Sequence, residues 1–243
     1  MKKNTIAIGL VLVASIIAAH ATTVVVDDFA GGPHVVSLVS LAPPEIATGT
    51  FVHGPALGGN RDAAVWSTSA GSFAAGVAFN AGGYASFVGT GKGGVVWDGV
   101  AGITDSNADN TITADELDYG LALDLSNCAV SGQINVSAFA DLPTATLDII
   151  IATDALNYSR YTIALTGTVN QFNDYTAALG SPTSTVGTLD FADVGAIALF
   201  IDASLLENLD VRVNNLAIAC PDNGWTLGLL GASLIGVGMI RRK

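Results

Sequence analysis

The chain has 243 residues, of which 50% are hydrophobic, 12% charged and 7% aromatic, and its formal net charge is −12. The hydrophobic content excludes an intrinsically disordered chain, and the small charged share excludes a coiled coil. Because a strongly negative chain repels phosphate, the composition also argues against nucleic acid as a partner.

The basic residues are concentrated at the two ends of the chain. Between Thr22 and Cys220 there are four basic residues against twenty acidic ones, which gives this body a net charge of −16. The other five basic residues lie at positions 2–3 and 241–243. Such asymmetry indicates that the ends are targeting segments and not parts of the fold.

Residues 1–21 have the composition of a secretory signal peptide. A basic start is followed by a short apolar run and by small residues, Ala19 and Ala21, at the positions expected of a cleavage site. A permanent membrane anchor would need about 20 apolar residues, and this run is shorter. We therefore predict a signal helix, export through the Sec translocon, and a mature chain that begins near Thr22.

The body, residues 22–219, is predicted to be all-β and to form a single jelly-roll-like β-sandwich. Its apolar residues alternate with polar ones or form short β-branched runs, separated by Gly, Asn, Asp and Pro. This pattern is typical of a sandwich or jelly roll, and a body of this length can form one double-sheet core. The expected strands are Thr23–Val26, Ala63–Ser67, Ser72–Phe79, Tyr84–Val88, Val95–Trp97, Leu121–Leu125, Gln133–Phe139, Leu147–Ala152, Tyr158–Leu165, Ala196–Ile201 and Leu209–Ile218.

Arg61, beside Asp62, is one of the few basic residues of the body. It could contact an anion or a sugar, or it could form a structural pair with a carboxylate that fixes the early strands. Bidentate pairing of arginine with carboxylates is common, so the structural interpretation is favoured.

Five aromatic residues of the body could form a sugar-stacking platform, or they could be core residues or cross-strand pairs. The second interpretation is favoured. They are Trp66, Tyr84, Trp97, Tyr158 and Tyr161.

Residues 105–116 fit the twelve-residue calcium loop of an EF-hand. Calcium takes six to eight hard oxygen ligands, and alternate positions of such a loop converge on one point. Asn110 stands where the loop favours Gly, and no entering helix precedes the loop. The alternative is an acidic loop closed by a capping box from Thr113 to Glu116. We predict one structural calcium ion held by Asp105, Asn107, Asp109, Thr111, Thr113 and Glu116, with Thr111 acting through its backbone carbonyl.

The chain has two cysteines, Cys128 and Cys220. In an exported protein they could form a disulfide that ties the last strand to the region after the calcium loop. Because Cys220 borders the C-terminal segment, it could instead be removed, modified or left unpaired. Sequence alone does not establish the geometry that a disulfide requires.

The last segment, residues 220–243, consists of a short polar element, an apolar run of roughly 16 residues and a basic cluster. The basic cluster would remain on the cytoplasmic side, so the run predicts a membrane helix that anchors the protein at least transiently. This segment resembles the PEP-CTERM sorting signals recognised by exosortases, especially their VPD-type variants. The matching positions are Pro221, Asp222, Gly224, Thr226, Leu229–Gly231, Arg241 and Arg242. Cys220 departs from the family, which usually has Val or another residue there.

Short motifs in the body resemble the β-sandwich ectodomains found in front of such tails. They are Asp27–Phe29, Gly58–Asp62, Trp97–Gly99, Phe191–Gly195 and Asp210–Asn215. The resemblance implies an exosortase-like sorting enzyme as a partner and a location at the cell surface, outer envelope or extracellular matrix. An ordinary single-pass anchor is the alternative interpretation of the tail.

The sequence contains no nucleophile elbow, phosphate loop, dinucleotide fingerprint or zinc-ligand spacing. We therefore expect no enzymatic activity. The predicted function is that of an exported, non-enzymatic surface or matrix protein stabilised by calcium. The alternative is a surface-anchored carbohydrate-binding module whose partner is a glycan or matrix polysaccharide.

Overall fold

The computed structural model describes residues 22–30, 34–40, 45–52, 56–67, 73–80, 82–106, 112–143, 145–166, 171–202 and 209–221. The segment Ala21–Asn223 forms one compact unit. The predicted signal helix and the predicted sorting helix lie outside these residues. Within the described ranges, no helix has the length and apolar character needed to cross a membrane.

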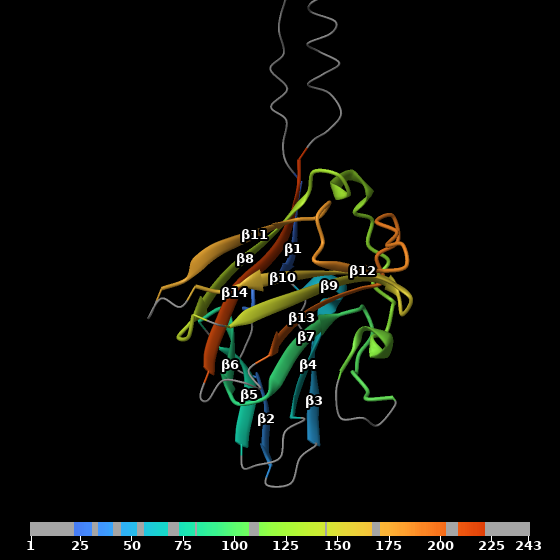
Figure 1. The fold of residues 1–243 in the computed structure, drawn as a ribbon. Coiled ribbons are helices and arrows are strands. Elements are labelled where there is room, and N and C mark those ends of the chain that lie inside the picture. The colour runs from blue at the N-terminus through green and yellow to red at the C-terminus, as the bar shows by residue number, and fades with distance from the viewer. Residues whose placement is uncertain are drawn as a thin grey trace, which may run out of the picture. The chain divides into compact units, whose positions relative to one another are not determined.

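The fold is all-β, with two sheets in which every neighbouring pair of strands is antiparallel (Figure 1). The first sheet has the order β11-β8-β14-β6-β5-β2, and β1 also pairs with β14. The second sheet has the order β12-β10-β9-β13-β7-β4-β3. The two sheets face each other across one core and form a β-sandwich.

The strand bounds of the first sheet are β1 Thr22–Asp27, β2 His34–Ser40, β5 Phe73–Asn80, β6 Tyr84–Gly89, β8 Gln133–Ala140, β11 Asn173–Ala178 and β14 Leu209–Cys220. Those of the second are β3 Glu45–Val52, β4 Asn60–Ser67, β7 Lys92–Trp97, β9 Thr146–Asp154, β10 Asn157–Ala164, β12 Ser184–Val186 and β13 Ala196–Asp202. Among the described residues, three short 3₁₀ helices lie between strands: η1 Leu57–Gly59, η2 Ala114–Glu116 and η3 Ser126–Cys128.

Alternation of side chains across the strands forms the core. In β8, Ile134, Val136 and Ala138 are buried between the sheets, while the residues between them are more exposed. This is the period of two expected of strands with one buried face. The predicted all-β sandwich is therefore confirmed.

Most of the predicted strands coincide with observed ones, but Leu121–Leu125 does not. In that segment only Leu123 forms a bridge, with Val194, and Ala122 has a positive φ of 50° that is incompatible with a regular strand. Its alternating leucines contact the core from a connection and not from a sheet. The structure also contains β2, β3, β11 and β12, which the sequence analysis did not predict.

The long connection between β7 and β8, residues 98–132, partly covers the outer face of the second sheet. Apolar residues from its first part pack in a second hydrophobic cluster with outward-facing residues of β4, β7, β9 and β13. Members of this outer cluster from the connection are Ile103, Ile112, Ala114 and Leu117. Three members of this cluster, Trp66, Ile112 and Ile150, also line the groove described below.

Candidate functional site

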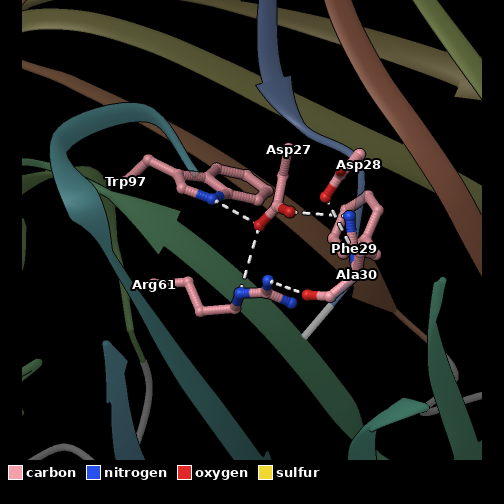
Figure 2. A network of polar contacts seen from close by, with 6 residues as sticks. All are labelled: Asp27, Asp28, Phe29, Ala30, Arg61 and Trp97. Atoms are coloured by element: carbon pink, nitrogen blue, oxygen red, sulfur yellow. Dashed lines mark hydrogen bonds and ion pairs between the residues drawn. The ribbon is translucent and has the colours of Figure 1, made fainter. Parts of the chain in front are cut away.

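Three of the short motifs meet in a buried polar hub between the sheets (Figure 2). At the end of β1, Asp27 accepts a hydrogen bond through Oδ1 from the N–H of Phe29 at 2.7 Å. Its Oδ2 accepts one from Nε1 of Trp97 at 2.9 Å and lies 3.3 Å from Nε of Arg61. Nη2 of Arg61 donates to the carbonyl of Ala30 at 2.8 Å. The hub therefore joins β1, β4 and β7.

Arg61 has a structural role in this hub. Both Arg61 and Asp27 are 0% exposed, and the guanidinium carbon lies 4.5 Å from the ring centroid of Phe79. Burial lowers the pKa of the Arg61 guanidinium from its usual value, and the carboxylates of Asp27 and Asp28 oppose that shift. No surface of Arg61 is left for an anion or a sugar, so the structural interpretation of this residue is confirmed.

Glycines let the chain pass closely beside the hub. Gly58 and Gly99 have positive φ angles of 74° and 76°. A Cβ on Gly99 would lie 2.8 Å from the carbonyl oxygen of Gly120, and a Cβ on Gly58 would lie 3.0 Å from the Cα of Gly99. Side chains at these positions would push the connections apart. These motif glycines therefore serve backbone packing.

Two buried carboxylates, Asp62 and Asp98, lie on the side of β4 and β7 that faces the β7–β8 connection. Asp62 accepts from the N–H of Gly102 at 3.2 Å. Asp98 accepts from the N–H of Val100 at 3.1 Å and of Asp118 at 3.3 Å. Burial raises the pKa of Asp98 to about 6, with its Val100 hydrogen bond opposing the shift and the charge of Asp62 adding to it. Burial also raises the pKa of Asp62.

The two ends of the predicted calcium loop lie together. Glu116 is 8% exposed, and its Oε1 accepts from the N–H of Ser106 at 2.9 Å. Its Oε2 accepts from the N–H of Thr113 at 3.1 Å, and the capping box before η2 is formed. The carboxylate of Glu116, at the last loop position, thus contacts the backbone of Ser106, the residue after Asp105 at the first position. A chelating loop requires its two ends to lie together in this way.

The middle of that loop, including Asn107, Asp109 and Thr111, lies outside the described residues. Within the described part of the chain, no group of three or more acidic, histidine or cysteine side chains is placed to hold a metal. The described oxygen donors, on Asp105, Thr113 and Glu116, are of the kind that calcium prefers. Calcium therefore stays a prediction, with the same six ligands.

Strand register places a set of polar and aromatic side chains on the outer face of the second sheet. In one row, Trp66 of β4 pairs with Lys92 of β7, which pairs with Asp202 of β13. Two residues along β13, Phe200 pairs with Asp148 of β9. The pairing of Arg160 with Ile150 adds a third row. Alternation brings these side chains to one face because every second residue of a strand points the same way.

These side chains line a groove of about 240 Å³ on that face. Its lining residues are Trp66, Lys92, Ile112, Thr113, Asp148, Ile150, Arg160, Phe200, Ile201 and Asp202. Nζ of Lys92 lies 2.9 Å from Oδ2 of Asp202, and Nη1 of Arg160 lies 3.9 Å from Oδ2 of Asp148. Thr113 of the predicted calcium loop contributes to one wall. The groove thus combines an apolar floor with two opposite-charge pairs.

Phe200 is the half-buried aromatic ring of the groove. A Cβ on Gly94, its cross-strand neighbour, would lie 2.3 Å from Cδ1 of Phe200, so the ring lies over the bare backbone of that glycine. The ring packs edge-on against Trp66, with centroids 5.8 Å apart. Gly94 and Trp66 therefore fix the position of this ring.

The five aromatic residues considered for a stacking platform do not lie together. Trp97 and Tyr161 belong to the core between the sheets, and Tyr84 lies on the first sheet, where Arg212 stacks 5.6 Å from its ring centroid. Trp66 is 3% exposed and forms part of the groove floor. The sequence analysis did not identify Phe200, Lys92, Asp148, Arg160 or Asp202 as site residues. Strands were predicted at or next to these residues, but the pairing of β7 with β13, which brings them together, was not.

Cys128 and Cys220 form a disulfide with their Cα atoms 4.5 Å apart. Cys128 ends η3 and Cys220 ends β14, where it pairs with Thr22 of β1. Both sulfurs are buried at the edge of the core. Cys220 is therefore an integral part of the sandwich, one of the outcomes that the sequence left open.

The targeting residues are outside the described structure. Pro221, which follows β14 directly, is the last described residue. The other sorting positions, Asp222, Gly224, Thr226, Arg241 and Arg242, and the predicted cleavage residues, Ala19 and Ala21, lie beyond the described ranges. The signal peptide and the sorting tail remain predictions.

In comparisons with known proteins, no family model and no curated sequence matches the chain. Among solved structures, it is similar to a family 11 carbohydrate-binding module of a cellulosomal cellulase from Clostridium thermocellum, with a TM-score of 0.39, 13% identity, and coverage of 82% of this chain and 95% of that one. A family 29 carbohydrate-binding module complexed with mannohexaose gives a TM-score of 0.37 and 11% identity, covering 83% and 94% of the two chains. An exo-beta-agarase gives 0.37 and 10%, covering 77% of this chain.

The chain spans only 24% of the exo-beta-agarase and 21% of a second structure, PfGH50B. With TM-scores and identities this low, these similarities carry no argument about ligand or activity. The proposals below rest on the residues of this chain.

Proposed function

We propose that the protein is an exported β-sandwich that displays a glycan-binding groove at the cell surface or in the extracellular matrix. The observation that carries the proposal is the groove on the second sheet, where Phe200 lies between the Lys92–Asp202 and Arg160–Asp148 pairs. A sugar ring has apolar C–H faces and polar hydroxyl edges. An aromatic ring flanked by charged donors and acceptors matches both.

Export is supported by the disulfide between Cys128 and Cys220, because disulfides persist in oxidising compartments. It is also supported by the position of β1. This strand begins at Thr22, directly after the predicted cleavage site, so removal of the signal peptide would leave the sandwich complete. The tail would then deliver the protein to an exosortase-like enzyme. We further propose the jelly-roll type for the sandwich, since β13 and β14 each insert between earlier strands of their sheets.

We propose binding without catalysis. Each carboxylate of the groove, on Asp148 and on Asp202, is held against a cation. The general acid of most glycosidases must instead carry a proton when it acts. A purely structural matrix protein, the main prediction from sequence, needs no such groove, so glycan binding is the better supported function.

A glycan array with the exported protein tests the proposal. We expect selective binding to a limited set of glycans, with loss of signal for Phe200→Ala and unchanged signal for Phe172→Ala, an aromatic substitution on the first sheet. Absence of binding to every glycan, with a correctly folded protein, would contradict the glycan-binding function.

The export proposal has a separate test. Mass spectrometry of the mature surface form should find no peptide from Leu227–Lys243.

A further inference from the structure

We infer that the groove binds an extended segment of a neutral polysaccharide, and neither a single sugar nor an acidic glycan. This inference rests on the proposed glycan-binding function and specifies its ligand. It follows from three properties of the described residues: the balance of charge in the groove, the charge of the surrounding body, and the length of the groove's lining.

The charges that line the groove cancel. Lys92 is matched by Asp202 and Arg160 by Asp148, so each pair places a donor beside an acceptor. A sugar hydroxyl both donates and accepts hydrogen bonds, and it can bridge such a pair without a change in net charge. A carboxylate or sulfate on the ligand would gain from the cation and be repelled by its partner anion. The groove therefore favours uncharged hydroxyl groups.

The body of the protein opposes acidic polymers. From Thr22 to Cys220 its net charge is −16, and only four basic residues offset the twenty acidic ones. A polyanion with many charges would meet this field before it reached the groove, although salt limits the range to about 10 Å. Two of the four basic residues line the groove, and both are already paired. Long-range electrostatics thus agrees with the local balance.

The lining of the groove extends over five neighbouring strands, from Arg160 on β10 to Trp66 on β4, which is longer than one sugar ring. Arg160 pairs with Ile150, which pairs with Ala198, four residues along β13 from Asp202. Three strand spacings separate β7 from β10 in the sheet order. These offsets place the Cα atoms of Lys92 and Arg160 roughly 20 Å apart along a diagonal of the face, while Asp202 and Asp148, the carboxylates that they approach, lie closer together on the neighbouring strands β13 and β9. Phe200 pairs with Asp148 and is two residues from Asp202, in the middle of this lining. A ligand that contacts the lining from end to end must therefore be a chain of sugars.

Calorimetry with the exported, disulfide-bonded protein tests this inference. The probes are neutral gluco-, xylo- and manno-oligosaccharides of increasing length, the corresponding monosaccharides, and oligogalacturonates as acidic counterparts, each at low and high salt. We expect affinity to rise with chain length for one neutral series and to change little with salt. Lys92→Ala and Arg160→Ala should each weaken binding by about three- to tenfold, because each removes a hydrogen-bond donor from one end of the ligand.

Arg212→Ala is the matched control. Arg212 also pairs with an aspartate, at 2.7 Å from Asp210, and its side chain is 38% exposed against 43% for Arg160, but it lies on the first sheet. Its substitution should leave the affinity unchanged. Preferential binding of oligogalacturonates, with affinity that falls as salt rises, would overturn the neutral-ligand inference while glycan binding stood. Equal affinity for a monosaccharide and its oligomers would overturn the extended site. If no glycan bound at all, the proposed function itself would fail.

Discussion

Two arginine–aspartate pairs in this protein are made of the same groups and lie in opposite environments. Arg61 and Asp27 are 3.3 Å apart in the hub between the sheets, and both side chains are 0% exposed. Arg160 and Asp148 are 3.9 Å apart in the groove, with side chains 43% and 28% exposed. The first pair has no solvent-exposed surface, and the second is partly exposed to solvent. The first therefore determines stability, while the second keeps donors and acceptors available to a ligand.

The same contrast applies more widely to the interior and to the outer face of the second sheet. In the interior, the hub joins strands that are distant in sequence, and the disulfide joins η3 to the end of β14. On the outer face, the β7–β8 connection contributes the buried Asp98, the ends of the predicted calcium loop and one wall of the groove. Substitutions in the interior should therefore lower the unfolding free energy most. Substitutions on the outer face should change it less, by amounts that depend on pH, calcium or ligand.

The largest effect is expected for Asp27→Ala. It would leave the buried Arg61 guanidinium without its ion-pair partner and Trp97 Nε1 without its acceptor. Breaking a buried pair in this way costs about 3–5 kcal/mol of unfolding free energy. The measurement is urea denaturation of residues 22–221.

Asp148→Ala is the matched control for the hub substitution. It removes the partner of Arg160, and its expected cost is below about 1 kcal/mol because the pair is exposed. Equal losses for the two variants would show that burial does not distinguish the pairs.

Removal of the disulfide should have the next largest effect. Cys128 and Cys220 are 92 residues apart in the chain, so the bond restricts a long loop in the unfolded state. Chain-entropy arguments give up to about 4.7 kcal/mol for a loop of this size, and measured values are typically about 2–4 kcal/mol. The double variant Cys128→Ser/Cys220→Ser should lose that much in urea denaturation. Chemical reduction of the wild-type disulfide should lower the unfolding free energy by the same amount. Equal losses would show that the missing bond, and not the serine substitutions, causes the effect.

The strands were largely predictable from sequence because alternation is a local property. β8 shows it directly, with Ile134, Val136 and Ala138 buried and the residues between them more exposed, whereas β9 is buried on both faces from Ile149 to Ala152. β2 was missed because its sequence does not alternate: Val35 and Val36 are both apolar, although the first is exposed and the second is buried. The strand predicted at Leu121–Leu125 was wrong for a physical reason. Alternation does not show whether a segment has neighbouring strands to pair with.

The partners of the site residues were not predictable in the same way. Arg61 was expected to pair with a carboxylate, but its partner Asp27 comes from another strand, and adjacent Asp62 faces away from it because neighbouring residues of a strand point to opposite faces. The groove depends on β13 inserting between β7 and β9, a non-local pairing. The capping box from Thr113 to Glu116 was predictable, since it needs only residues three apart.

Asp98→Asn tests the outer face through pH. Because burial raises the pKa of Asp98 from 3.8 to about 6, the neutral acid is favoured in the folded state. Its stabilising contribution is therefore fully present below about pH 3.8 and lost as the pH rises through about 6. A shift of this size corresponds to about 3 kcal/mol at most.

The unfolding free energy of Asp98→Asn relative to wild type should therefore rise between pH 4 and pH 7, whatever constant effect the amide has on packing. Urea denaturation across this range measures it. Asp124→Asn, an exposed aspartate that also accepts a backbone N–H, serves as the control. A constant difference between Asp98→Asn and wild type across the range would show that Asp98 ionises freely.

Calcium should give the smallest effect and tests the wall of the groove. The predicted ligands include Glu116, whose carboxylate already accepts hydrogen bonds from Ser106 and Thr113. Glu116→Gln will therefore lower stability in EDTA as well, and the informative quantity is the difference between calcium and EDTA. Binding to the folded state alone, at ten times Kd, adds about 1.4 kcal/mol to the unfolding free energy. Extracellular sites have Kd values of about 10⁻⁴–10⁻³ M, so millimolar calcium suffices.

Thermal melting of residues 22–221, which retain both cysteines, should show this increment for wild type and for Asp124→Asn, but not for Glu116→Gln. Identical melting of wild type in calcium and in EDTA, without binding heat in calorimetry, would mean that the loop is an acidic turn closed only by its capping box.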